Sequence, residues 1–219
     1  MREPHPAGTI GYTASILLIS IDILIWLLLI VSLAAVVTVF LHIWTGVPYV
    51  PTPQPVVDAM VKAANIRKGE TVVDLGAGDC RLLIAAKRRY PSIRAWGCEL
   101  VPTIWILGKI RIWLSRQDVD LRLGEAFLQD VSGADVIFLY LMPEVLRKLE
   151  PRFDALLKPG TRVISHAFRF AKREPVRTLK IPSVFHEKTV LVYAWAPRPS
   201  SSSAGRAGGR KRSARSSRE

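Results

Sequence analysis

The chain has 219 residues, of which 49% are hydrophobic, and a formal net charge of +13. This length suits one ordinary domain with appendages, and the apolar fraction is sufficient for a folded core. Its two cysteines, Cys80 and Cys98, argue against a secreted scaffold built on disulfides. With four scattered histidines beside them they show no metal-ligand spacing, so we expect no metal site.

A short N-terminal segment, residues 1–13, precedes a nearly continuous apolar stretch over residues 14–44. No charged residue occurs among the nineteen residues from Ile23 to Leu41, and a helix of that length spans about 30 Å, the hydrocarbon thickness of a bilayer. The stretch is too long for a signal peptide and lacks a basic N-terminal flank. It predicts one uncleaved transmembrane anchor. Asp22 near its start either reaches the headgroups or contacts a partner helix.

The charges on either side of this anchor predict its orientation. Arg2 is offset by Glu3 before the apolar stretch, whereas Lys62, Arg67 and Lys68 follow it, ahead of a basic domain. The positive-inside rule then places the following domain on the cytoplasmic side of the membrane. We expect a single-pass protein, with the bacterial inner membrane as the favoured location.

Residues 45–65 are expected to connect the anchor to the domain. Four prolines between positions 46 and 55 favour extended backbone over helix. Apolar residues at helical spacing then predict a short helix over residues 56–64.

Strand-like and helix-like runs alternate from residue 66 to residue 196, which we take as the catalytic domain. The pattern predicts strands over 71–75, 94–98, 119–123, 136–141 and 161–165, with a closing hairpin of 178–181 and 188–195. It predicts helices over 81–90, 103–116 and 143–157. Such alternation indicates an α/β fold with a parallel, Rossmann-like sheet of seven strands and right-handed crossovers.

The segment Asp74-Leu75-Gly76-Ala77-Gly78-Asp79 carries the strongest chemical signal in the chain. It lies between the first predicted strand and a helix, and its glycines permit positive φ and close approach of a ligand. Glycine turns at the carboxyl ends of parallel strands are where open α/β sheets bind nucleotides. An ordinary strand-to-helix turn is the alternative interpretation.

Glu99 ends the second predicted strand, where an acidic side chain can bind ribose hydroxyls. A dinucleotide site also needs a third glycine and free N–H groups for the pyrophosphate, whereas here Asp79 follows the second glycine. That carboxylate would repel a pyrophosphate and tolerate the amino group and sulfonium of S-adenosylmethionine (SAM). We therefore expect SAM, with Gly76 and Gly78 facing its methionine part and Asp79 accepting from its amino group.

Three further strand ends carry candidate site residues. Glu125 follows the third strand, where methyltransferases often place an acid near the adenine amine, although it also reads as a helix-start acid. Tyr140 and Pro143 follow the fourth strand, and Ser165 and His166 end the fifth. Core packing is the alternative interpretation for these last four.

The sequence resembles the small family of membrane-anchored protein-lysine methyltransferases. That family includes the mitochondrial enzymes acting on the ATP synthase c subunit and on the adenine nucleotide translocase, with archaeal relatives. The matching motifs span residues 49–168: Tyr-Val-Pro-Thr at 49–52, the turn at 74–79 with Arg81, Glu99, Leu-Tyr-Leu-Met-Pro at 139–143, and residues 157–166.

The resemblance implies a class I SAM-dependent methyltransferase fold preceded by one transmembrane helix, and methyl transfer to a lysine ε-amine, with a membrane protein as a candidate substrate. Deprotonating that amine at pH 7.4 costs about 4 kcal/mol, and a dry aromatic pocket lowers a lysine pKa without a dedicated base. Tyr140 and Pro143 are then the candidate catalytic residues. Four more residues are expected to face the substrate or form a lid: Tyr49, Thr52, Ser165 and His166.

One position departs from the family pattern, because Cys80 stands where the family has a third glycine. We expect its thiol to add volume close to the cofactor. The departure leaves open a degenerate membrane scaffold, in which residues of the third predicted helix dock on the bilayer: Trp105, Ile106, Ile112, Trp113 and Leu114.

The basic tail, residues 197–219, contains Ser, Gly, Ala and Arg but few apolar side chains, and we expect it to be disordered. Anionic lipid and nucleic acid are candidate partners for it, and a solvated tail without a specific function is an equal alternative. An RNA or small-molecule methyltransferase is therefore a further alternative to the lysine enzyme.

Overall fold

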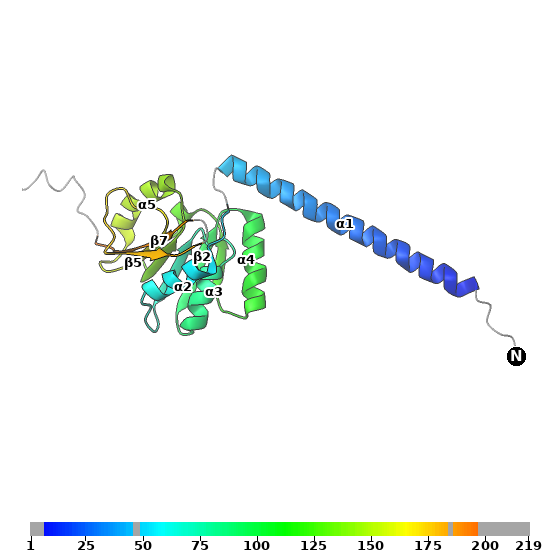
Figure 1. Cartoon of the computed structure of the whole chain (residues 1–219), viewed down its shortest axis with the longest axis horizontal. Helices are drawn as coiled ribbons and strands as arrows, with labels where there is room; N and C mark the ends of the chain where they lie inside the picture. Colours follow the sequence, from blue (N-terminus) through cyan, green and yellow to red (C-terminus); the bar gives the residue numbers. More distant parts are fainter. Residues whose placement is uncertain (1–6, 46–48, 184–185, 197–219) are drawn as a thin grey trace, which may run out of the picture.

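The computed structural model describes residues 7–45, 49–183 and 186–196. The predicted basic tail and the first six residues of the N-terminal segment lie outside this part of the chain. Figure 1 shows a layered α/β domain joined to one long helix, α1 (Ala7–Thr45).

A seven-stranded sheet forms the centre of the domain, in the order β3-β2-β1-β4-β5-β7-β6. The first five strands are parallel, and β7 is antiparallel to both β5 and β6. This arrangement confirms the predicted sheet and its closing hairpin. The strands are β1 (Thr71–Leu75), β2 (Arg94–Glu99), β3 (Asp120–Leu123), β4 (Val136–Leu139), β5 (Arg162–His166), β6 (Arg177–Ile181) and β7 (Lys188–Ala194).

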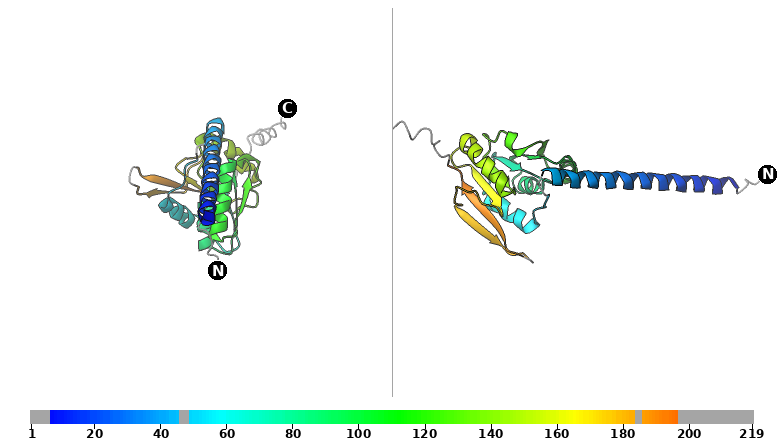
Figure 2. Two further views of the ribbon diagram at one scale, coloured as in Figure 1. Left: turned by 90° about the vertical axis from the view of Figure 1, so that its right-hand side faces the viewer. Right: turned by 90° about the horizontal axis from the view of Figure 1, so that it is seen from above.

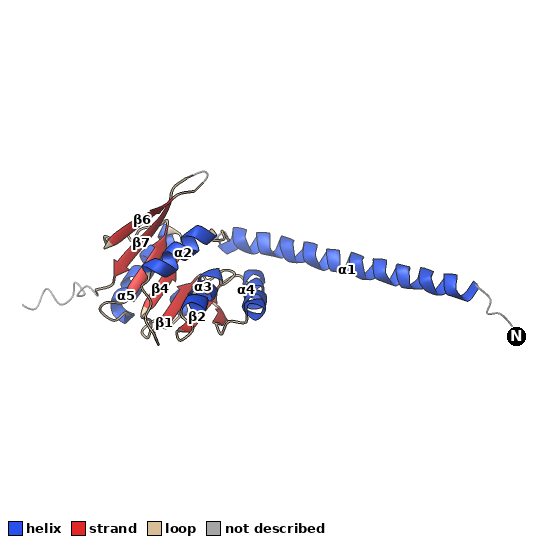
Figure 3. Ribbon diagram, turned by 60° about the horizontal axis from the view of Figure 1, so that its bottom comes forward, coloured by secondary structure: helices blue, strands red, loops and turns tan. Residues whose placement is uncertain are grey.

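Helices cover both faces of the sheet (Figure 3). They are α2 (Gln54–Ala63), α3 (Arg81–Arg89), α4 (Pro102–Ser115), α5 (Pro143–Leu156) and the short 3₁₀ helix η1 (Ala126–Leu128). Each predicted helix is present within two residues of its expected bounds, and α1 begins earlier than residue 14. The fourth strand ends at Leu139 instead of residue 141, because the chain turns there toward Pro143 at the start of α5.

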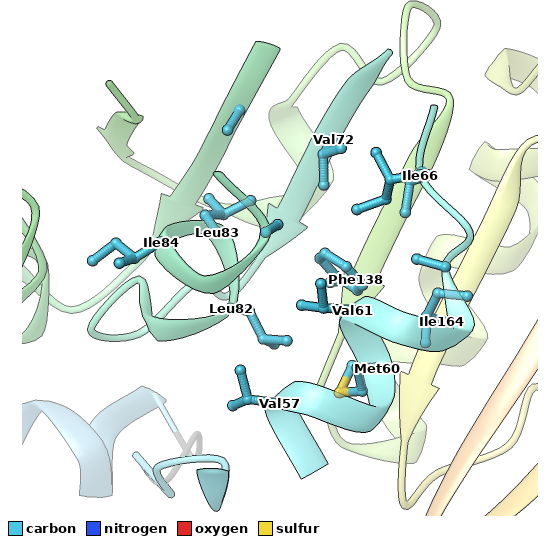
Figure 4. Packing of buried hydrophobic residues seen from close by; sticks show 14 of the residues in the cluster. Val57, Met60, Val61, Ile66, Val72, Leu82, Leu83, Ile84, Phe138 and Ile164 are labelled. Atoms are coloured by element: carbon cyan, nitrogen blue, oxygen red, sulfur yellow. The ribbon is translucent and has the colours of Figure 1, made fainter. Parts of the chain in front are cut away.

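Alternate residues of the strands feed two hydrophobic clusters, one on each face, as the period of a β-strand requires. Val72 and Phe138 pack against α2 and α3 in the first cluster, part of which Figure 4 shows. Val73 and Ile137 pack in the second, where Phe153 of α5 meets the edge of Trp195 at a centroid distance of 5.3 Å. Both clusters lie between residues 56 and 195, and the first includes the apolar side chains of α2.

The long helix α1 extends away from the domain (Figures 1 and 2). Within it, residues Ser15–Phe40 are long and apolar enough to cross a membrane, and their large apolar side chains are exposed. A hydrogen bond of 2.7 Å from the Thr38 hydroxyl to that of Thr103 joins α1 to the start of α4.

Candidate active site

A cleft of about 620 Å³ lies at the carboxyl ends of the central parallel strands. This is the size range of small-molecule sites, and strand carboxyl ends are where α/β sheets bind ligands. The walls come from five separate segments and from two helices. They comprise residues 49–52, 76–79, 98–101, 124–127 and 140–142, with Asp74, Arg81, Leu82, Glu144, Val145, Lys148 and Phe168.

The glycine turn at the base of the cleft needs both of its glycines. Gly76 and Gly78 have φ of +78° and +55°, a region that other residues adopt only with strain. A Cβ on Gly76 would lie 2.7 Å from Leu141, and one on Gly78 would lie 3.0 Å from the ring of Tyr49. The turn is therefore fixed by backbone conformation and by close packing together.

Three N–H groups of this turn are already engaged within the protein. Those of Gly76 and Ala77 donate to the carbonyl of Cys98 at 3.0 and 2.8 Å, and that of Gly78 donates to the Glu99 carboxylate at 2.9 Å. A pyrophosphate binds through free N–H groups at such a turn, so the geometry disfavours a dinucleotide.

Two buried carboxylates, Asp74 and Glu99, line the same cleft. Burial, and then the nearby charges of Glu99 and Asp79, raise the pKa of Asp74 to about 8. The second Glu99 oxygen accepts from the backbone of Val101 at 2.9 Å, which fixes the side chain at the end of β2. An acceptor-rich, acidic cleft of this kind fits a ligand that carries an ammonium, a sulfonium and ribose hydroxyls.

Asp79 has a different environment from the one expected. Arg81 holds it bidentately at 2.9 and 2.6 Å, and Arg111 of α4 approaches it to 3.1 Å. Burial acts to raise its pKa, but the hydrogen bond and charge of Arg81 and the charge of Arg111 outweigh burial and lower it. The carboxylate thus pairs with two guanidinium groups in addition to lining the cleft.

Arg81 also fastens the segment Tyr49–Thr52 over the turn. Its second terminal nitrogen donates to the Thr52 carbonyl at 2.8 Å. Tyr49 hydrogen-bonds with Asp79 and Arg81, and burial followed by the charge of Asp79 raises its pKa to about 12. The sequence singles out Arg81 only as part of a motif, and it does not point to Arg111, because nothing in the local pattern distinguishes this residue from a surface arginine.

The candidate acceptor-side residues separate into two groups. Tyr140 lines the cleft, as does the cofactor candidate Glu125, whereas Pro143 begins α5 between the lining residues Met142 and Glu144. Tyr140 lies beside His166, with ring centroids 4.1 Å apart.

Ser165 and His166 lie behind that surface, fully buried, and do not line the cleft. The Ser165 hydroxyl donates to the Phe168 carbonyl at 2.7 Å, so it supports the loop whose Phe168 ring faces the cleft beside Tyr140. Burial, and then the charge of Lys188, lower the pKa of His166 to about 4, which keeps its ring neutral at pH 7.

The expected crowding of the cofactor by Cys80 is not seen. Cys80 is buried in the hydrophobic cluster beneath α2 and α3 and does not line the cleft. Its φ of +62° lies in the left-handed region, which glycine adopts without strain and a residue with a side chain does not. A cysteine at position 80 therefore strains the backbone of the turn but does not reduce the volume of the cleft.

Comparison with known proteins places this fold and cleft in a family. A model described as the ANTKMT methyltransferase domain matches residues 74–177. A protein-lysine N-methyltransferase of Saccharolobus islandicus is 34% identical over 154 residues, covering 67% of this chain and 92% of its own. The adenine nucleotide translocase lysine N-methyltransferase of mouse is 32% identical, and this chain spans 62% of its length.

Among solved structures, an RNA methyltransferase from Salinibacter ruber in complex with S-adenosyl-L-homocysteine is similar with a TM-score of 0.64 and 34% identity. The alignment covers 69% of this chain and 97% of that one. Its bound product identifies SAM as the cofactor of the fold, in agreement with the acidic cleft. The chain belongs to the family of protein-lysine N-methyltransferases with the ANTKMT methyltransferase domain, and is a class I SAM-dependent methyltransferase.

Proposed function

We propose that the enzyme transfers methyl groups from SAM to a lysine ε-amine of a membrane protein. In this proposal α1 spans the membrane and holds the catalytic domain at its cytoplasmic face. The observation that carries this proposal is the short distance along the chain between α1 and the first residues that line the cleft. Its lining segment begins at Tyr49, four residues after the end of α1 at Thr45, so an anchor and an active site are adjacent. The archaeal and mouse relatives supply lysine as the acceptor.

Asp74, Glu99 and Glu125 would hold the ammonium, ribose hydroxyls and adenine amine of the cofactor, while Gly76 and Gly78 allow close approach. When bound, SAM supplies an electrophilic methyl group on its sulfonium. Asp79, paired with two arginines, would act chiefly by holding Tyr49–Thr52 against the turn. The charges of these side chains and their positions around the cleft support the assignments.

On the acceptor side, Tyr140, Phe168 and Phe127 present aromatic surface to the cleft. An apolar aromatic wall disfavours the ammonium form of a lysine and so favours the neutral nucleophile. Tyr140 would orient the nitrogen, and alignment of nucleophile and methyl group supplies much of the rate. Pro143 would fix the turn that places Tyr140, and Ser165 and His166 would support Tyr140 from behind.

The proposed boundaries follow the same organisation: N-terminal segment 1–13, anchor 14–44, connector and short helix 45–65, catalytic domain 66–196 and tail 197–219. Lys62, Arg67 and Lys68 after the anchor support a cytoplasmic domain. We expect the bacterial inner membrane as the location.

Incubation of the purified enzyme with tritiated SAM and a membrane extract tests the acceptor. The expected result is a labelled protein band that yields methyl-lysine on hydrolysis. Glu99→Gln and Tyr140→Phe should each lower the labelling at least tenfold, whereas the matched controls Glu174→Gln and Tyr90→Phe, outside the cleft, should not. Label recovered after hydrolysis in a product other than methyl-lysine would contradict the proposal.

RNA is the second candidate acceptor, because the similar Salinibacter ruber protein is described as an RNA methyltransferase. The same incubation decides between the two acceptors. Label that is lost on ribonuclease treatment and survives protease would favour RNA, and the reverse pattern would favour protein.

A further inference from the structure

The outward face of α4 is apolar. Five of its large hydrophobic side chains are exposed, and Trp113 and Leu114 are the most exposed, at 76% and 67%. Trp105 and Ile112 instead pack partly against the core. The exposed residues recur at helical spacing and form one face, which we name the α4 outer face: Ile106, Leu107, Ile110, Trp113 and Leu114.

The other domain helices do not share this property. The last turn of α3 carries Lys87, Arg88 and Arg89, and α5 presents Arg147 and Lys148 to solvent. In α4, by contrast, apolar residues occupy the outer as well as the inner face, although only Ile104 and Gly108 are buried in it. An apolar helix face is normally covered, by protein or by lipid.

The position of α4 relative to α1 indicates lipid. The hydroxyl contact between Thr38 and Thr103 sets the start of α4 level with the end of the apolar stretch at Phe40. In Figures 1 and 3, α4 lies on the side of the domain from which α1 departs, and Figure 1 shows that it runs across the direction of α1. A bilayer crossed by α1 would therefore have its surface along α4.

The charge of α4 also suits an anionic membrane surface. Residues 101–117 contain Lys109, Arg111 and Arg116 and no acidic residue. Basic side chains beside an apolar face that bears a tryptophan are typical of helices lying in the headgroup layer. Each basic residue near an anionic surface adds about 1 kcal/mol of attraction.

We propose that α4 lies in the headgroup layer with the α4 outer face in contact with lipid, an inference that rests on the proposed membrane-spanning role of α1. The bilayer would then hold the domain at two places, α1 and α4. Because Val101 at the start of α4 lines the cleft and Arg111 pairs with Asp79, this second contact would fix the cleft at the membrane surface.

Spin labels on the full-length enzyme in vesicles of phosphatidylcholine and phosphatidylglycerol test the proposal. Leu114→Cys carries the test label, and Arg147→Cys on α5 is the control for a water-exposed helix; the native Cys80 and Cys98 are buried. At position 114 we expect high collision with oxygen and low collision with a water-soluble nickel complex, and the reverse at position 147. SAM binding verifies that both variants are folded.

A third label, on Val31→Cys within α1, distinguishes failure of α4 to dock on lipid from failure of α1 to span the membrane. Lipid exposure at 31 together with water exposure at 114 would overturn the docking of α4 and leave the anchor standing. Water exposure at 31 would overturn both. Protection of position 114 from both reagents would mean that protein covers the α4 outer face, which also contradicts the proposal.

Discussion

Cys80 shows how a single backbone angle can outweigh side-chain chemistry. The residue is fully buried, so a hydrophobicity argument alone would favour valine there over glycine. Its left-handed backbone, with φ of +62° and ψ of 15°, reverses that order, since a β-branched residue in this region is strongly strained. We expect Cys80→Gly to be about 2 kcal/mol more stable than Cys80→Val by urea unfolding in detergent.

Cys98 provides the matched control for this prediction. It is equally buried but lies in the extended backbone of β2, where valine is favoured over glycine. There the order should invert, with Cys98→Val about 1 kcal/mol more stable than Cys98→Gly. The same order at both positions would show that backbone strain at Cys80 is unimportant. Neither Cys80 variant should change SAM affinity, because the thiol does not line the cleft.

Asp74 makes the stability of the protein without SAM depend on pH. Its pKa is about 8 in the folded protein against an ordinary value of 3.8, so between these values the folded state binds a proton that the unfolded state has lost. Stability is therefore highest at low pH for this group and falls as pH rises through 8, by up to about 1.4 kcal/mol per pH unit.

The variant Asp74→Asn cannot titrate and should lack this decline. Between pH 6.5 and 8.5 we expect the free energy of unfolding of the wild type to fall by about 2 kcal/mol relative to the variant. His166, with its lowered pKa, contributes only below pH 6.5 and does not interfere. Parallel pH profiles of the two proteins would refute a raised pKa for Asp74.

The segment Tyr49–Thr52 has no regular secondary structure and depends on Arg81 for its position. The arginine joins three parts of the chain, namely this segment, Asp79 in the turn and the start of α3. Arg81→Gln should lower the free energy of unfolding by about 2 kcal/mol, the value of hydrogen bonds to a charged group. It should weaken SAM binding about tenfold in calorimetry, because part of the cleft wall must then be ordered on binding.

Arg89→Gln is the control, since this arginine lies on the same helix and its side chain donates to the hydroxyl of the neighbouring Tyr90 at 3.3 Å, away from the cleft. It should change stability by less than about 0.5 kcal/mol and leave SAM binding intact. If both variants bind SAM equally well, Arg81 does not organise the cleft.

The strands and helices were largely predictable from sequence, and the contacts between them were not. Strand β1 has the bounds that its apolar run predicts, and the glycine turn follows it as expected, because both depend on local pattern. Arg111 reaches Asp79 only through the packing of α4 on the sheet. Ser165 and His166 occupy the expected strand end but do not line the cleft, because His166 packs against the Tyr140 ring and the Ser165 hydroxyl donates to the Phe168 carbonyl.

The anchor and the catalytic domain are expected to have separate roles, in membrane attachment and in SAM binding. Every residue of the two hydrophobic clusters lies between Val56 and Trp195, so α1 contributes nothing to the core among the described residues. The domain should consequently fold and bind SAM without it, and the anchor should act by concentrating the active site at the membrane.

Removal of residues 1–45 separates these two roles. The shortened protein should keep the thermal midpoint of the domain and its SAM affinity, measured by calorimetry. Its labelling of membrane proteins with tritiated SAM should fall by about 100-fold at low enzyme concentration, since tethering raises effective concentration by 10² to 10⁴. The loss should diminish as enzyme concentration is raised, because an untethered active site then meets its acceptor by diffusion. Undiminished labelling by the shortened protein at every concentration would mean that the cleft finds its acceptor without the anchor.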